Sequence, residues 1–196
     1  MANDPVAIGN MALANIGQPS VQNFEQSNTA SRALKLRYDE ARREALSACL
    51  WNFASLWQAG VAVDIDPKPG WAYVYSYPTD ALRVFEIQRL TVDDKDIPFE
   101  VTARPGGAGK LIHTNMADAV FIYAGNVTDT TLFDSDFDTA LSWLLSHKIA
   151  MAVTKSVKLR DDAMKMWLAL ADKARARTKN ERTEDTDITP TYQGVR

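Results

Sequence analysis

Two groups of aspartates are the residues of this chain that come nearest to a catalytic arrangement. Two carboxyl groups that flank a glycosidic bond can hydrolyse it, one acting as acid and the other as base or nucleophile. The groups are Asp93, Asp94 and Asp96, in a polar turn between expected strands, and Asp134, Asp136 and Asp138, at an expected helix start. Turn formation and helix capping explain both groups. We therefore expect neither of them to be catalytic.

The two histidines and the single cysteine do not form a reactive or metal-binding set. His113 ends an expected short strand and His147 lies on an expected helix, and neither belongs to a spacing such as HExxH. Cys49 falls on the apolar face of an expected helix, which favours a buried structural thiol in a reducing compartment. We expect no catalytic residue, no metal and no cofactor.

Two stretches could in principle contact phosphate groups. Residues 106–110 are rich in glycine, but they lack GxxxxGK[ST] and lie between expected strands, so we expect a hairpin loop. A basic run follows near the end of the last expected helix, and a helix end alone explains such a run. Its members are the candidate contacts to DNA or to a partner: Lys173, Arg175, Arg177 and Lys179.

Composition places the chain among folded globular proteins. It has 196 residues, of which 46% are hydrophobic and 24% charged. The net charge of −3 argues against a basic surface over the whole protein. The first ten residues lack the pattern of a signal peptide, and no apolar run reaches about 18 residues, so we expect no membrane span.

Residues 27–57 are the stretch around which we expect the core to form. Ser27 can cap a helix over residues 28–50, after a first helix that begins at Asn3 or Asp4 with Pro5 and ends at Gly17. Its apolar face is Leu34, Tyr38, Ala41, Ala45 and Cys49, its outer surface includes Arg32, Lys35, Asp39, Arg42 and Arg43, and its aromatic end is Trp51, Phe53 and Trp57. We expect the three aromatic side chains to be buried.

Strands and two further helices follow. The expected strands cover residues 71–77, 82–90, 97–103, 111–114 and 119–124, and their close spacing favours antiparallel pairing. A helix is expected from Phe133, capped by Asp134, Ser135 or Asp136, then a turn near residues 156–160 and a last helix over 161–182. The inward face of that last helix is expected to be Met166, Trp167, Leu170 and Ala174.

The fold class predicted from these elements is α+β. Residues 1–57 and 132–182 are expected to form a four-helix bundle, and residues 58–131 an inserted small antiparallel β domain. Residues 183–196 are polar and are predicted to be a flexible arm that orders on a partner. The residues of this arm expected to bind a partner or a neighbouring copy are Ile188, Pro190, Tyr192, Val195 and Arg196.

Three stretches of the sequence carry a family resemblance. They are Leu13-Ala-Asn-Ile16-Gly17-Gln18-Pro19-Ser-Val21, residues 30–38 with Glu44, Leu46 and Trp51-Asn52-Phe53, and Tyr75-Ser-Tyr77-Pro78-Thr-Asp80-Ala-Leu82. They resemble, in turn, the LxxIGxPxV start, the long helix leading to W-x-F, and the Y-x-Y-P-x-D-x-L that opens the sheet of short-tailed phage head-to-tail adaptors. This is the tail tubular protein A-like family.

The resemblance implies a structural protein rather than an enzyme. Members form a twelve-subunit ring under the portal, extend the DNA channel and present a platform for the tail nozzle or tube. The implied partners are the portal protein, the nozzle or tube protein, neighbouring copies, and genomic DNA that passes without sequence readout. The implied location is the virion, at the head–tail junction, after synthesis in the host cytoplasm.

Two other functions are compatible with the residues alone. A cell-wall-degrading tail hydrolase would need an acid pair such as Asp134 and Asp136 to line a cleft. A DNA-contacting packaging factor would need the four basic residues of the last helix to form one exposed patch.

Overall fold

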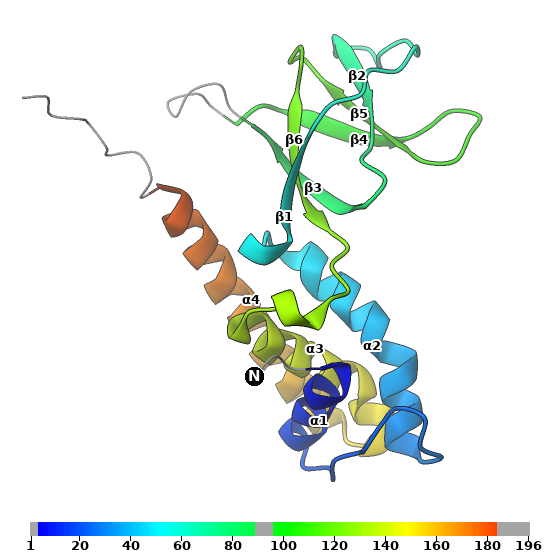
Figure 1. Cartoon of the computed structure of the whole chain (residues 1–196), viewed down its shortest axis with the longest axis vertical. Coiled ribbons are helices and arrows are strands. Elements are labelled where there is room, and N and C mark those ends of the chain that lie inside the picture. Colours follow the sequence, from blue (N-terminus) through cyan, green and yellow to red (C-terminus); the bar gives the residue numbers. More distant parts are fainter. Residues whose placement is uncertain (1–3, 89–95, 184–196) are drawn as a thin grey trace, which may run out of the picture.

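The computed structural model describes residues 4–88 and 96–183, which form a mixed α/β structure. Within these residues there are four helices: α1 (Pro5–Asn15), α2 (Thr29–Ala48), α3 (Ser135–Val153) and α4 (Val157–Thr183). The strands are β1 (Ser55–Ala59), β2 (Tyr73–Ser76), β3 (Ala81–Ile87), β4 (Phe99–Ala103), β5 (Lys110–Thr114) and β6 (Val120–Gly125). The helices occupy one end of an elongated molecule and the strands the other (Figure 1).

Local capping residues determine where the first two helices begin and end. The Asp4 side chain accepts a hydrogen bond from the Ala7 N–H at 2.6 Å, as the sequence predicted for a helix that begins at Pro5. Gly17 follows the helix with φ +69°, the left-handed conformation expected of it. The cap of α2 is Asn28, which accepts from the Ser31 N–H, and the prediction of Ser27 was wrong by one position.

The centre of the helical core is α3, and not α2 as the sequence suggested. α3 packs against each of the other three helices. It is buried over most of its circumference, because its apolar and small residues do not keep to one stripe. Ser146 allows α1 to approach α3 closely, because its small side chain donates a hydrogen bond to the Ala12 carbonyl of α1 at 2.9 Å. The Asn15 side chain of α1 donates in turn to the hydroxyls of Ser142 and Ser146.

The aromatic residues after α2 divide between the core and the surface. Trp51 is 4% exposed, donates its Nε1–H to the Ala45 carbonyl at 2.9 Å, and meets the Phe137 ring edge-on. Phe53 also packs against Phe137. Trp57 lies on β1 and is 75% exposed, so the expectation that it is buried was wrong. The chain leaves the helix after Ala48 and becomes extended, which directs Trp57 away from the helical core.

Six strands form two antiparallel sheets of three, and every pairing is antiparallel as predicted. The strand order is β1-β6-β3 in one sheet (sheet A) and β2-β5-β4 in the other (sheet B). A second apolar core joins them, in which Tyr75 of sheet B meets the Phe121 ring of sheet A edge-on. In β3 a register shift between Val84 and Glu86 breaks the predicted alternation, so that Val84 and Ile87 are both buried.

A buried arginine joins the helices to the sheets. Arg42 of α2 is 3% exposed, although its position in the sequence suggested the outer surface. Its guanidinium donates to the Asn126 side chain at 2.9 Å and to the Val127 carbonyl, both just after β6, and it forms an ion pair with Asp39. The segment after β6 therefore covers this part of α2 and is tied to it.

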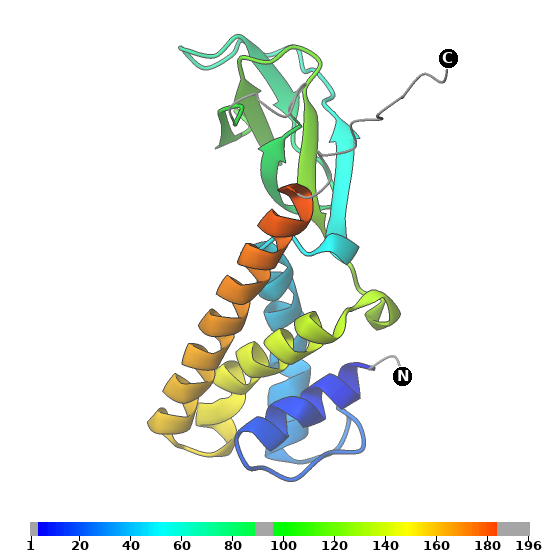
Figure 2. The ribbon, with the colours of Figure 1, turned by 90° about the vertical axis from the view of Figure 1, so that its left-hand side faces the viewer.

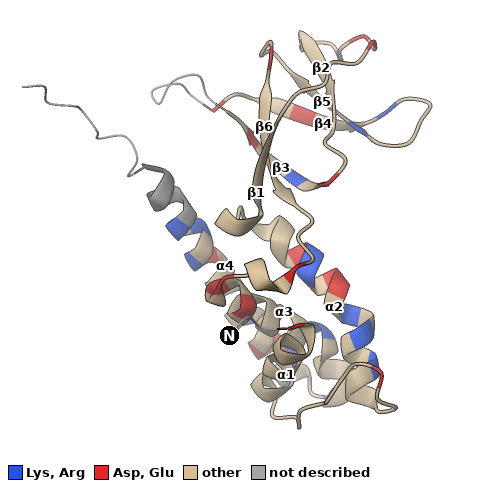
Figure 3. Ribbon diagram, in the orientation of Figure 1, with Lys and Arg blue, Asp and Glu red and all other residues tan. Residues whose placement is uncertain are grey.

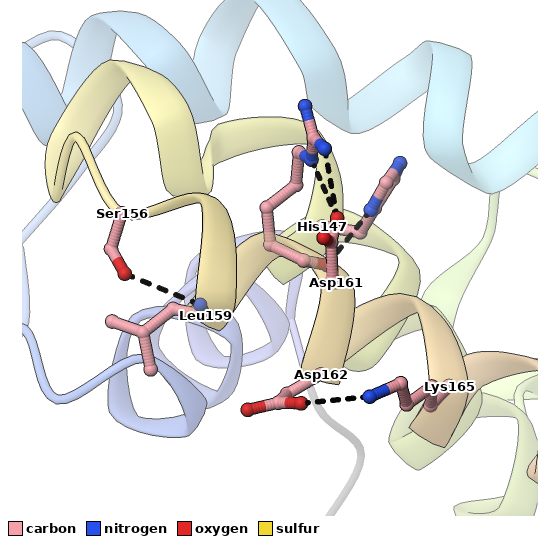
Figure 4. A network of polar contacts seen from close by, with 7 residues as sticks. His147, Ser156, Leu159, Asp161, Asp162 and Lys165 are labelled. Carbon is pink, nitrogen blue, oxygen red and sulfur yellow. Dashed lines mark hydrogen bonds and ion pairs between the residues drawn. The ribbon is translucent and has the colours of Figure 1, made fainter.

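The last helix begins earlier than predicted. The turn between α3 and α4 is at Lys155, with φ +57°, and the Ser156 hydroxyl accepts from the Leu159 N–H. Because Ser156 caps it in this way, α4 starts at Val157 instead of residue 161, and His147 of α3 donates from Nδ1 to the Arg160 carbonyl in its first turn at 3.0 Å (Figure 4). Ala163, Trp167 and Ala171 are its buried positions, whereas Met166 is 43% exposed, contrary to prediction.

Candidate functional site

The basic residues of α4 turn in different directions. Residues two apart on a helix project roughly 200° apart, so successive members of the basic run at residues 173–179 point to nearly opposite sides of α4. Arg175 binds Asp172 and donates to the Ala48 carbonyl at the end of α2, whereas Arg177 forms an ion pair with Asp136 of α3 at 2.7 Å. Lys173 is exposed, and the Lys179 side chain lies outside the described residues. The structure thus directs Arg175 and Arg177 to separate contacts within the chain.

The carboxylates at the start of α3 have separate structural roles. Asp134 accepts a hydrogen bond from the Phe137 N–H at 2.6 Å and caps the helix, so it is the cap among the three candidates Asp134, Ser135 and Asp136. Asp136 pairs with Arg177, and Asp138 is buried at 5% exposure. Among the described residues no group of three or more His, Cys, Asp or Glu is placed to hold a metal ion. Of the other predicted group, Asp93 and Asp94 lie outside the described residues.

His113 is a buried residue of sheet B whose tautomer opposes a role as general base. The Lys68 N–H donates to Nδ1 at 3.3 Å, so the ring proton is on Nε2 and is directed at the Thr102 hydroxyl 3.0 Å away. A base that activates Thr102 would have to accept the hydroxyl proton at Nε2. Glu100 lies nearby, and its hydrogen bond from the Lys68 ammonium holds the pKa of the carboxyl below its usual range.

Cys49 and the glycine-rich loop have the structural roles expected of them. Cys49 is 3% exposed, and burial raises the pKa of its thiol to about 12, so the thiolate is not formed near neutral pH. The loop joins β4 to β5, with the Arg104 N–H bonded to the Gly109 carbonyl. Gly106 and Gly109 adopt φ of +66° and +111°, which favours glycine there.

An apolar surface on sheet A was missed by sequence reasoning, because β1 was assigned to the end of a buried helix. An open groove of about 320 Å³ lies at β1, and its lining residues, which we call the Trp57 surface, are Ser55, Leu56, Trp57, Gln88 and Ile122. Among the described residues β1 pairs on one side only, with β6, so it is an edge strand of the described sheet. Exposed tryptophan beside an open strand edge is typical of an interaction site.

The predicted binding residues of the arm, which are Ile188, Pro190, Tyr192, Val195 and Arg196, lie outside the described residues. In the described part of the chain, no helix has the length and hydropathy needed to cross a membrane.

The residues that carry the family resemblance have clear roles in the fold. Leu13, Ile16 and Val21 are buried, and the Asn10 side chain bonds both the N–H and the carbonyl of Val21. In the later stretch, Asp80 accepts a hydrogen bond from the Tyr123 hydroxyl. No protein-family model matches the chain, and no curated protein matches it significantly.

Proposed function

We propose that this chain is a structural head-to-tail adaptor of a short-tailed phage. The observation that carries the proposal is the LxxIGxPxV-like stretch from Leu13 to Val21, followed by the helix, sheet and helix order of that family. In this proposal twelve copies form a ring beneath the portal, extend the DNA channel and present a platform for the nozzle or tube. The protein is then part of the virion, at the head–tail junction.

The division of the molecule into two ends supports this role. We assign the four helices to one bundle, made of residues 1–57 and 132–182, and residues 58–131 to an inserted β domain. Helices and sheets lie at opposite ends of the long axis (Figure 1), and Arg42 ties the two ends together. An adaptor needs such separate surfaces, one for the portal and one for the tail.

The distribution of charge supports passage of DNA without retention. Basic and acidic residues are mixed along α2 and along the described part of α4 (Figure 3). Arg175 and Arg177 each face an aspartate, so their attraction for phosphate is reduced. In the assembled ring we assign the basic residues of α4, including Lys173 and Lys179, to the channel or to a partner, and Ile188, Pro190, Tyr192, Val195 and Arg196 to the portal or a neighbour.

The test is electron microscopy of negatively stained protein with and without the portal ring of the same phage. We expect single copies or loose associations alone, and capped portal rings in the mixture. The truncated chain 1–182 serves as the control for the arm: it should remain folded and fail to cap the portal. Portals that stay bare with the full chain would overturn the adaptor proposal, and capping by the truncated chain would overturn the role of the arm.

A further inference from the structure

The outer face of sheet A is an exposed apolar surface next to an unpaired strand edge. Phe121 and Tyr123 of β6 point into the core between the sheets, so Ile122 and its cross-strand partner Trp57 point to the opposite face. Trp57 is 75% exposed and Ile122 is half-buried. The free edge of β1 presents backbone donors and acceptors that an added extended segment can pair.

The described chain ends on the side of the molecule to which this surface faces (Figures 1 and 2). α4 lies on the side of the molecule towards which sheet A turns its outer face, and its end reaches the level of the base of the sheet (Figures 1 and 2). Thirteen residues, 184–196, follow Thr183. An extended chain of that length spans about 45 Å, which is about 2.5 times the length of a five-residue strand such as β1.

The composition of residues 184–196 fits the Trp57 surface. Ile188 and Tyr192 are four residues apart, so in an extended segment both side chains point to the same side. On sheet A the apolar partner for such a side is Trp57 with Ile122, because the two residues are paired across β1 and β6 and share one face.

We propose that residues 184–196 bind the Trp57 surface of their own chain in the unassembled protein, as an extended segment along the edge of β1. Ile188 and Tyr192 cover Trp57 and Ile122. The inference does not require the adaptor function, because it concerns the free chain alone; a partner that binds the segment would expose the Trp57 surface.

A disulfide between two introduced cysteines tests the contact. Gln58→Cys on β1 and Gln193→Cys in the segment should form an intramolecular disulfide at a rate independent of protein concentration. Val101→Cys with Gln193→Cys is the matched control, because Val101 is also on an exposed strand position but in sheet B. We expect the first pair to react at least about tenfold faster, since binding raises the effective concentration of the segment. When Ile188→Ser and Tyr192→Ser are added to the chain with Gln58→Cys and Gln193→Cys, its rate of disulfide formation should fall to that of the control pair.

A second measurement compares the full chain with chain 1–183, which has the same Trp57 surface but lacks the segment. Acrylamide quenching of Trp57, taken as the difference between each chain and its Trp57→Phe variant, should be stronger in chain 1–183 than in the full chain. Equal quenching, equal disulfide rates for the two pairs, or disulfide-linked dimers that increase with concentration would each overturn the proposal; the dimers would show that a second copy supplies the segment.

Discussion

Replacing Trp51 by alanine should destabilise the protein more than any surface substitution of the same residue type. The side chain is 4% exposed and packs edge-on against Phe137 with 5.0 Å between ring centroids. Truncating a buried tryptophan costs about 3–5 kcal/mol, and the Ala45 carbonyl also loses the indole N–H. We expect the free energy of unfolding to fall by about 4–5 kcal/mol, near the upper end of that range.

Urea unfolding followed by circular dichroism at 222 nm measures the change. With a slope of about 2–3 kcal/mol per M urea, the midpoint should fall by about 1.5–2 M. Trp57→Ala is the matched control, with both substitutions made in chain 1–183, where Trp57 is 75% exposed; it should change the free energy by about 0.5 kcal/mol or less. An unchanged midpoint for Trp51→Ala, or equal losses in both variants, would refute the placement of the core.

Three further outcomes follow from buried or paired groups. Arg42→Met should lower the free energy of unfolding by about 2–4 kcal/mol, because two acceptors beyond β6 lose their donor, whereas the exposed neighbour change Arg43→Met should have little effect in the same urea assay. Cys49, with a thiol pKa of about 12, should react with an aromatic disulfide reagent at pH 8 only as fast as the protein unfolds, and immediate reaction of the native protein would contradict its burial. The hydrogen bond from the Lys148 ammonium lowers the pKa of Glu40 from 4.5 to about 2, so its stabilising effect is present above pH 4.5 and is lost as the pH falls towards 2; Glu40→Gln should flatten the acid side of the stability–pH curve, weakly and less so in high salt.

The sequence alone determined features that depend on a few adjacent residues. The start of α1 at Pro5 and its end at Gly17 were predicted correctly, and the caps Asp4 and Asp134 were among the two and three candidates that the sequence offered. The hairpin at residues 104–110 and the antiparallel pairing of the strands were also predicted. Each depends on backbone conformation or capping within a few residues, or on the short connections between strands, which the sequence shows directly.

The tertiary structure decided which side chains are covered. Trp57 belongs to the same aromatic cluster in sequence as Trp51, but one is on an open strand edge and the other is in the helical core. Arg42 is buried because a segment more than 80 residues later packs over α2, and α3 is central because three helices meet it. The Trp57 surface arises in the same way. Burial depends on which distant elements meet, and the local pattern of apolar residues does not contain that information.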